Sequence, residues 1–487
     1  MKRVVTYIFA FTVLANVSFA QNEFDVLRYS TLNHHGDARF NAMGGSFGAL
    51  GANLSVLSIN PGGLGVYKSS DFSVTPAFHY NYSESNKDGN SVTDGKLNFN
   101  VSNIGFAGNF VGSGDWKSVN IAIGYNRLSN YNTSISIKSN TSNSLLDTYV
   151  SNLNSNGGTY EEDIPGAFPF SSNLAYQTYL VNPLALYSSQ YDHVFENSTN
   201  ISQSTRYETR GGSGEMYFAL GSNYSDKLYI GVLIGRPIVR YVYDRYYTET
   251  ADPSDTLTEF KSFSVHDFVK TKGTGLNLKL GMIYKLADWF RIGTAFHTPT
   301  VYSLSDQWST KVSSENKSGE VLSEVSPSGN FEYIVTTPYR FVTSVAFVIG
   351  KHGVINGDYE ILDYSTARIK EDNAFGSPDF SNENQSVRNN FRLTHNIRVG
   401  TEWRLDSFRL RAGYRFQGDP LKNNFKADNS SSTYSFGIGI KQDDYYFDMG
   451  YSLNSHKAES VILGEQNDFA SVNLKNHYIS MTLGFRF

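Results

Sequence analysis

The chain ends in the stretch YISMTLGFRF, residues 478–487, in which apolar side chains alternate with small or polar ones. Successive side chains of an extended strand point to opposite faces, so this period of two predicts a β-strand with one apolar face. The apolar face carries Ile479, Met481, Leu483, Phe485 and Phe487. The other face carries Ser480, Thr482, Gly484 and Arg486. Such a strand fits a sheet with hydrocarbon on one side and a polar interior on the other.

The same alternation recurs from about residue 71 to the end of the chain. We predict about fourteen strands, an even number as expected of a bacterial barrel. They lie near residues 71–82, 97–110, 117–139, 203–224, 227–248, 262–286, 288–310, 328–350, 352–370, 386–404, 407–418, 430–441, 444–458 and 470–487. The short joins are predicted to be periplasmic turns, at 112–115, 225–226, 287–288, 350–351, 405–406 and 442–443. The long Asn- and Ser-rich joins between them are predicted to be extracellular loops.

The composition favours a membrane barrel over a soluble sheet, which could show the same alternation. Of the 487 residues, 15% are aromatic and 18% are charged, whereas about a quarter of a soluble domain is charged. Mean hydropathy is −0.35, and after the first residues no stretch reaches the ~20 apolar residues of a spanning helix. Open sheet edges cannot be satisfied in hydrocarbon, so a spanning sheet must close. The predicted fold is all-β, a transmembrane antiparallel β-barrel of about 14 strands.

The first twenty residues have the pattern of a secretory signal peptide. Lys2 and Arg3 form a basic start, residues 4–17 are mostly apolar, and 18–20 form a small-x-small cleavage site. We therefore expect residues 1–20 to be cleaved. Export without a spanning helix predicts that the protein lies in the bacterial outer membrane as a multi-pass barrel.

The mature chain is predicted to have two parts. An N-terminal hatch over 21–70 would plug the lumen, and the barrel would follow over 71–487, with a long extracellular loop containing helical patches at about 140–210.

The absence of cysteine excludes disulfides, thiolate metal sites and a cysteine nucleophile. A net charge of −5 gives no sign of a nucleic-acid partner.

A Gly-rich apolar segment precedes the first predicted strand. It reads AMGGSFGALG at 42–51 and NPGGL at 60–64. These motifs resemble the hatch of the FadL/TodX (OmpP1-like) family of outer-membrane transporters for hydrophobic compounds, in which an AMGG-F-AL segment precedes NPAGL; Gly62 here replaces Ala. RIGTAFHTP at 291–299 and GDYEILDYS at 357–365 are similar to two strand motifs of the family, the second in Bacteroidetes-type members. The resemblance spans nearly the whole mature chain.

The resemblance implies a passive transporter for hydrophobic small molecules, such as long-chain fatty acids, with no enzymatic activity, cofactor or metal. The ligand would be captured outside the cell, pass a movable hatch and leave sideways between strands. The hatch residues implied to gate the lumen are Met43, Gly44, Gly45, Phe47, Leu50, Leu54, Leu57, Asn60, Pro61, Gly62, Gly63 and Leu64. The apolar ones could equally pack the plug against the wall, while Asn60 and Pro61 would fix a turn and the two glycines after them would supply backbone freedom.

The implied partners are the hydrophobic ligand and outer-membrane lipid. The barrel-assembly machinery would read the last strand, which ends at Phe487. We expect a monomer. Two alternatives remain open from the sequence: a barrel that serves as a scaffold or shuttle for a secretion system or client protein, and a haem uptake protein.

Two further groups of residues are candidates for ligand contact. Apolar residues of the long loop predict a capture groove or a lid packed on the barrel mouth; they are Phe170, Leu174, Tyr176, Tyr179, Leu180 and Leu184. Strand parity places luminal arginines on the inward face, namely Arg409, Arg411, Arg415 and Arg486. Guanidinium groups suit a fatty-acid carboxylate. A luminal ion-pair network would explain them as well, with the inward acids Glu402, Asp448, Asp358 and Glu360.

Three weaker signals remain. Gly105, Gly108 or Gly124 could mark the strand kink of a lateral opening. The stretch GGSFG at 44–48 matches a nucleophile-elbow pattern, but it follows no predicted strand, so we interpret it as small-residue packing. His34 and its neighbour lack the partner spacing of a metal or haem site.

Overall fold

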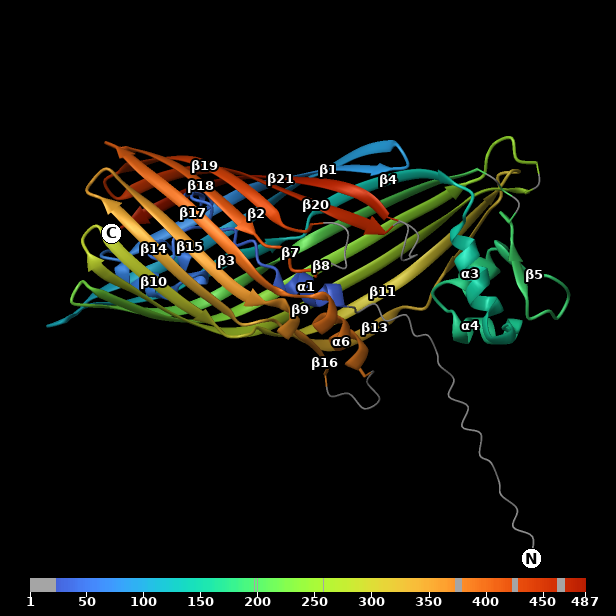
Figure 1. Cartoon of the computed structure of the whole chain (residues 1–487), viewed down its shortest axis with the longest axis horizontal. Helices are drawn as coiled ribbons and strands as arrows, with labels where there is room; N and C mark the ends of the chain where they lie inside the picture. Colours follow the sequence, from blue (N-terminus) through green and yellow to red (C-terminus); the bar gives the residue numbers. More distant parts are fainter. Residues whose placement is uncertain are drawn as a thin grey trace, which may run out of the picture.

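The computed structural model describes residues 23–487 apart from 197, 199, 257, 373–378, 423–427 and 462–468. The predicted signal peptide, 1–20, lies outside the described residues. The described chain forms one closed barrel of fourteen antiparallel strands, with the N-terminal segment inside it (Figure 1). None of the described helices is long and apolar enough to cross a membrane.

Each barrel strand pairs with the next one along the chain, and some are interrupted into two labelled segments. In order around the barrel they are β1 (Asp71–Lys87), β2 (Asn90–Val111), β3 (Trp116–Asn130) with β4 (Thr133–Thr141), β7 (Ile201–Tyr224), β8 (Leu228–Thr250), β9 (Phe260–Ala287), β10 (Phe290–His297) with β11 (Val301–Asn316), β14 (Arg340–Ile349) with β13 (Gly329–Thr336), β15 (Gly353–Asp363) with β16 (Arg368–Glu371), β17 (Leu393–Leu405), β18 (Phe408–Gln417), β19 (Ser431–Gln442), β20 (Tyr445–Val461) and β21 (Phe469–Arg486). The last strand pairs with the first, with Asp71 opposite Arg486, and this closes the barrel.

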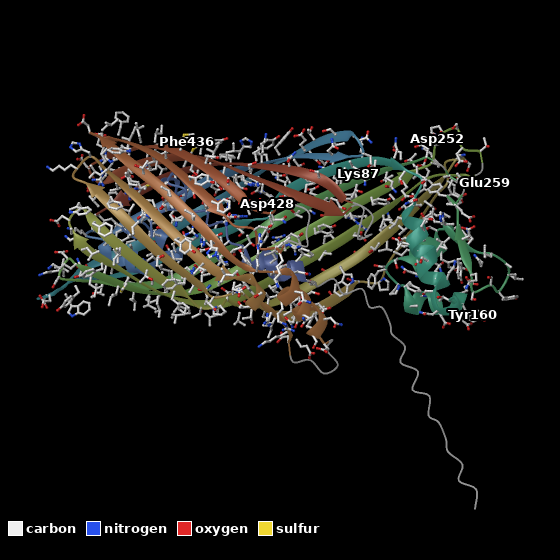
Figure 2. All side chains as sticks on the ribbon, in the orientation of Figure 1. Lys87, Tyr160, Asp252, Glu259, Asp428 and Phe436 are labelled. Atoms are coloured by element: carbon white, nitrogen blue, oxygen red, sulfur yellow. The ribbon has the colours of Figure 1, made fainter. Side chains whose placement is uncertain are left out.

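The period-two pattern predicts the orientation of the wall correctly. Ser480 and Thr482 of β21 are buried on the inner face, whereas Leu483 of the alternate parity is 60% exposed on the outside. Phe436 of β19 likewise projects from the outer surface (Figure 2). The six predicted periplasmic turns are the short connections at the end of the barrel where the C-terminus lies.

The opposite end carries the long connections, and there the sequence prediction needs correction. The predicted strand 386–404 begins only at Leu393, because α6 (Ser381–Asn390) occupies its first residues with a polar sequence that has no period of two. A short extra strand, β12 (Val321–Val325), pairs with β11. Because β7 begins at Ile201, the long connection after β4 spans 142–200 rather than about 140–210.

That connection folds into a small subdomain at the far end of the taller wall (Figure 1). It contains α3 (Leu145–Asn154), η3 (Ser155–Gly157), η4 (Glu161–Asp163), α4 (Ile164–Ala167), α5 (Ser172–Gln177), β5 (Val181–Pro183) and β6 (Tyr191–His193). Ser144 caps α3 by accepting from the Leu146 amide, and Asp147 accepts from the Ser144 amide. Of the helical patches predicted for this loop, the one at 145–153 is a single helix, whereas the one at 168–186 contains only the short helix α5 and then becomes extended.

Candidate functional site: the plugged lumen

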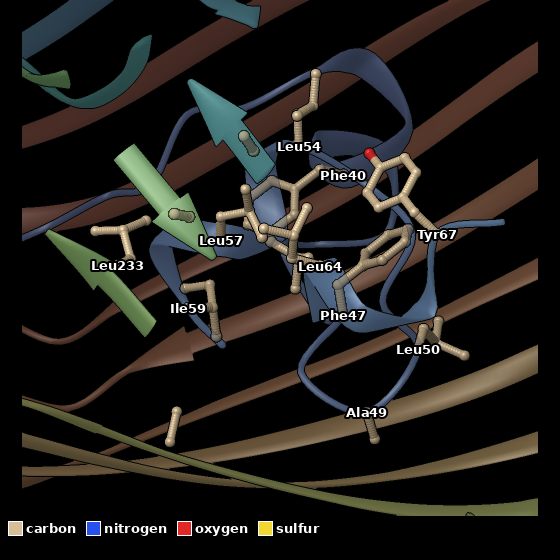
Figure 3. Close-up of a cluster of buried hydrophobic side chains, with 14 of the residues drawn as sticks. Phe40, Phe47, Ala49, Leu50, Leu54, Leu57, Ile59, Leu64, Tyr67 and Leu233 are labelled. Carbon is tan, nitrogen blue, oxygen red and sulfur yellow. The ribbon is translucent and has the colours of Figure 1, made fainter. Parts of the chain in front are cut away.

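The N-terminal segment lies inside the lumen (Figure 1). It consists of α1 (Glu23–Ser30), α2 (Ala38–Ala42) and the two short 3₁₀ helices η1 (Ser55–Ser58) and η2 (Pro61–Val66). From Phe40 onward its apolar side chains form one buried cluster with the wall (Figure 3), whereas Val26 and Tyr29 of α1 lie in a second cluster with residues of β13 and α6. The predicted hatch residues in the first cluster, none more than 6% exposed, are Met43, Phe47, Leu50, Leu54, Leu57 and Leu64. In this conformation they pack the plug and meet no open channel.

Small residues let the plug and the wall approach each other. A Cβ on Gly231 of β8 would lie 2.1 Å from the Pro61 carbonyl oxygen, and one on Gly62 would lie 2.7 Å from the Cα of Met282. Gly62 and its neighbour are therefore required for close packing, and the expectation that they supply backbone freedom is wrong. Positive φ occurs instead at Gly44 (+65°) and Gly45 (+76°), where the chain turns after α2.

Asn60 holds the turn that the sequence motif predicts. Its side-chain oxygen accepts from the Gly62 amide at 3.0 Å and caps η2, with Pro61 at the start of that helix. Its side-chain nitrogen donates to the Gly48 carbonyl at 2.7 Å and to the Met282 carbonyl of β9 at 3.1 Å. One amide therefore joins two parts of the hatch to each other and to the wall.

On its other side, the hatch is bound to the wall through charged side chains. Arg39 of α2 forms a bidentate ion pair with Glu402 of β17, at 2.7 and 3.1 Å. Asp358 of β15 accepts from the backbone amides of Phe47 and Gly48, both at 3.1 Å. Because these contacts are buried, breaking them without a substitute partner is costly. The plug is thus held by specific polar contacts as well as by apolar packing.

The four predicted luminal arginines have different environments. Arg411 lies between Glu402 and Asp448, each at 2.7 Å, in the ion-pair network that was the alternative to carboxylate binding. Arg415 donates to the backbone carbonyl of Asn33. The remaining two lie at the periplasmic mouth, where Arg486 pairs with Asp71 at 3.3 Å and Arg409 donates to carbonyls of its own turn.

A polar cavity of about 290 Å³ lies on the periplasmic side of the plug. Its lining includes Arg39 and Asp37 from the hatch together with Arg404, Arg409 and Arg411 from the wall. Polar walls of this kind hold water well and an acyl chain poorly. This space is therefore an unfavourable exit for an apolar ligand.

The predicted capture residues divide into buried and exposed ones. Leu174 and Leu180 are at most 2% exposed in the core of the loop subdomain. Phe170 and Tyr176 are partly buried, with Phe170 against the ring of Trp308. Tyr179 and Leu184 are 62% and 66% exposed. Only this last pair presents an apolar surface fully to the outside.

A buried carboxylate that the sequence analysis missed joins this subdomain to the wall. Glu249 of β8, fully buried, accepts from the Ser144 hydroxyl at 2.5 Å and the Leu145 amide at 2.7 Å at the start of α3. A carboxylate at a helix N-terminus is stabilised by the amides there. The inward parity of Glu249 was visible in the sequence, but its partner is 105 residues away.

The barrel wall has a seam between β2 and β3. The two strands pair only from Asn103 to Val111, opposite Asn126 to Ser118. Beyond this point, the carbonyls of Arg127 and Leu128 accept instead from the part of the N-terminal segment that precedes α2. These bonds come from the amides of Asn33 (2.9 Å), His34 (2.9 Å) and His35 (3.0 Å).

The same segment also contacts the other side of the seam. The Ser102 hydroxyl of β2 donates to the Gly36 carbonyl at 2.6 Å, and the ring of His35 stacks on Tyr478 with centroids 4.4 Å apart. Burial, with the nearby Arg398 charge, lowers the pKa of the His34 imidazole well below its ordinary value. The seam is therefore closed by residues 33–36, a neutral segment that leads directly into α2.

Further out, the β1–β2 hairpin covers the free edge of β4 with side chains. Asn81 of β1 accepts from the Ser134 amide at 3.1 Å, and the Ser83 hydroxyl donates to the Ser134 carbonyl at 2.7 Å. Asp94 of β2 accepts from the Ser134 hydroxyl at 2.8 Å. Hydrogen bonds made by side chains can open over a shorter stretch of the wall than those of a continuous backbone ladder.

The fold and this site define an outer-membrane β-barrel whose lumen is plugged by its own N-terminal segment. Residues 235–483 match the sequence profile of a family described as outer membrane protein transport protein (OMPP1/FadL/TodX). Because the match covers more than half of the chain, the protein belongs to this family of outer-membrane proteins. No curated protein sequence matches the chain significantly.

Solved structures share the fold at low sequence identity. The toluene transporter TodX of Pseudomonas putida has a TM-score of 0.53 and 12% identity, over 93% of this chain and 99% of that one. A FadL homologue of Pseudomonas aeruginosa has a TM-score of 0.53 and 10% identity, over 93% and 98%. The CymD monoaromatic hydrocarbon channel has a TM-score of 0.51 and 11% identity, over 94% and 99%. These matches establish the fold.

The buried ion pairs predict unequal effects of two neighbouring arginines. Arg411→Gln would remove the cation that pairs with Asp448, and breaking a buried pair costs about 3–5 kcal/mol. Arg409→Gln, two residues along the same strand, should change the free energy of unfolding by less than about 1 kcal/mol. Urea unfolding of the refolded protein in vesicles measures both. Equal effects would contradict the assigned network.

Removing the plug should open the lumen. Deletion of residues 42–65 is expected to raise single-channel conductance in a planar bilayer. A milder variant, Asn60→Ala, removes three hydrogen bonds of the hatch and should raise the frequency of brief openings. Heat-modifiable mobility on gels checks that each variant has folded. Folded variants with unchanged conductance and gating would rule out the plug assignment.

Proposed function

We propose that the protein is a passive outer-membrane transporter that admits hydrophobic small molecules, such as long-chain fatty acids, and releases them sideways into the bilayer. The observation that carries the proposal is the seam: the β3 edge at Arg127 and Leu128 bonds to the N-terminal segment rather than to β2. Membership of a family of outer-membrane transport proteins supports it. We assign the chain no catalytic step and no cofactor.

Capture would begin at the extracellular subdomain. Tyr179 and Leu184 offer exposed apolar surface at its tip, and exposed apolar patches on secreted proteins commonly mark binding sites. The buried members of the predicted set, such as Leu174, would support this surface from beneath. From here the ligand would enter the outer half of the lumen.

Release would follow movement of the hatch. The segment at 31–36 leads into α2, so displacement of the plug would withdraw the amides that occupy the β3 edge. A gap at the seam would then open to hydrocarbon. An apolar ligand gains free energy by entering the bilayer, whereas the polar periplasmic cavity would expose it to water.

Locking the seam should block transport. The chain has no cysteine, so His35→Cys with Arg127→Cys introduces one possible disulfide, at positions that face each other as an isolated β-bridge. Oxidation is expected to lower uptake of labelled oleate and toluene about tenfold in cells that carry this barrel as their only such transporter. Reduction should restore uptake.

The matched control is a cross-link where the ladder between the same strands is intact. Phe106→Cys with Ile123→Cys joins β2 to β3 on the lipid-facing side below the seam. Its oxidation should leave uptake unchanged. If oxidation at the seam has no effect although the disulfide has formed, lateral release at this position is excluded.

Substituting the exposed loop residues should weaken capture of the ligand more than it slows the maximal rate of transport. Tyr179→Ser with Leu184→Ser removes apolar contact area, so uptake at low oleate concentration should fall several-fold while the rate at saturation changes little. Tyr160→Ser, a 59% exposed residue of the same loop, serves as the control. A loss of the same size in the control would show that the effect is not specific to the predicted groove.

A further inference from the structure

Three cations on the outside of the barrel lie where the apolar surface ends. The outward face of β9 is apolar from Leu286 to Leu276 and then continues towards the extracellular side with Thr274, Lys272 and Lys270. Ten residues of a tilted strand rise about 25 Å, the height of the apolar band of an outer-membrane barrel. These lysines therefore lie at the level of the lipid headgroups in the outer leaflet.

The neighbouring strand β8 carries cations on both sides of Ile238 on its outward face, with exposed Arg236 before it and Arg240 after it. Ile238 of β8 faces Thr274, and Arg240, the next outward residue, stands directly opposite Lys272. Lys270 is the diagonal neighbour of Arg240. Like charges directly opposite each other in a sheet are destabilising, so this surface gains from an anion that lies between them.

Glu332 lines a groove with Arg240 and Lys272, but no described acidic side chain forms an ion pair with the three cations. Arg206 and Arg210 of the adjacent strand β7 pair with Asp94 (3.4 Å) and Asp244 (2.5 Å). In contrast, Arg240, Lys270 and Lys272 form no ion pair with any residue in the described part of the chain. An anion from outside the protein can therefore pair with them.

A groove of about 480 Å³ begins at these cations. Its floor consists of small side chains, Thr274, Ser303 and Ser305, which lie between the longer Ile238, Arg240, Lys272 and Glu332. Lys272 faces Ser305 across the ladder, so a hydroxyl lies beside the ammonium group. The groove thus joins a cationic, hydroxyl-lined part to the apolar side chain of Ile238.

We infer that this outer groove binds one lipid of the outer leaflet whose headgroup carries phosphate. Arg240 and Lys272 bind the phosphate, because a guanidinium and an ammonium at headgroup level match its charge and its acceptor oxygens. The hydroxyl floor accommodates a polar headgroup, and Ile238 with Leu276 contacts the first part of an acyl chain. The site faces away from the lumen, so it is independent of the proposed transport path.

Native mass spectrometry of the refolded full-length protein in mild detergent tests this site. The probes are a purified diphosphorylated lipid A and the same lipid after removal of both phosphates. We expect phosphate-dependent binding to the unaltered protein. Lys272→Gln should weaken it about tenfold, and the double variant R240Q/K272Q should abolish it.

The matched control is Lys475→Gln. Lys475 is an exposed cation on the outward face of β21, but it has Tyr82 and Ser455 opposite it rather than a second cation. This variant should bind the diphosphorylated lipid as the unaltered protein does, and heat-modifiable mobility confirms that all variants have folded.

Three results would overturn the inference: equal binding of the dephosphorylated lipid, retained binding in R240Q/K272Q, or an equal loss in Lys475→Gln. Uptake of oleate by R240Q/K272Q should remain normal, so failure of the lipid site is distinguishable from failure of the transport proposal.

Discussion

The need to satisfy every backbone hydrogen bond in hydrocarbon governs this structure. Fourteen strands meet the requirement by closing on themselves, with Asp71 opposite Arg486 at the closure. The wall departs from this rule where β3 extends beyond its pairing with β2. There the backbone carbonyls of Arg127 and Leu128 are satisfied by the N-terminal segment, so the plug also completes the wall.

Closure also decides what the lumen must contain. A barrel of this size would hold an aqueous channel if it were empty, and the hatch fills the space with a compact set of short helices. The inner wall accommodates it through small side chains such as Ala107 and Ala219, and through Asp358 and Glu402, which bind hatch groups directly. Because polar contacts are directional, they set the position of the plug, whereas the apolar cluster contributes most of the buried area.

The two proposals concern opposite faces of the barrel wall. Inside, Arg411 is held in buried ion pairs with Glu402 and Asp448. Outside, Arg240 and Lys272 lack any described partner and lie beside a groove. The residue types are the same, and their surroundings give them different roles. Exposed apolar side chains at the loop tip, Tyr179 and Leu184, would supply the capture surface for the transport path.

Local periodicity determined most of the wall by itself. The alternation at 478–487 recurs along the barrel and predicted strand number, facing and the short turns, because a strand's side-chain direction depends only on residue parity. Periodicity placed Arg411 and Glu402 inward, but it could not pair them across strands, nor show that Leu174 is buried in the loop's own core. The seam, the Glu249 contact with Ser144 and the position of Arg240 opposite Lys272 were decided by the tertiary structure alone. They depend on register and on contacts between residues distant in sequence, which the chain's local pattern does not encode.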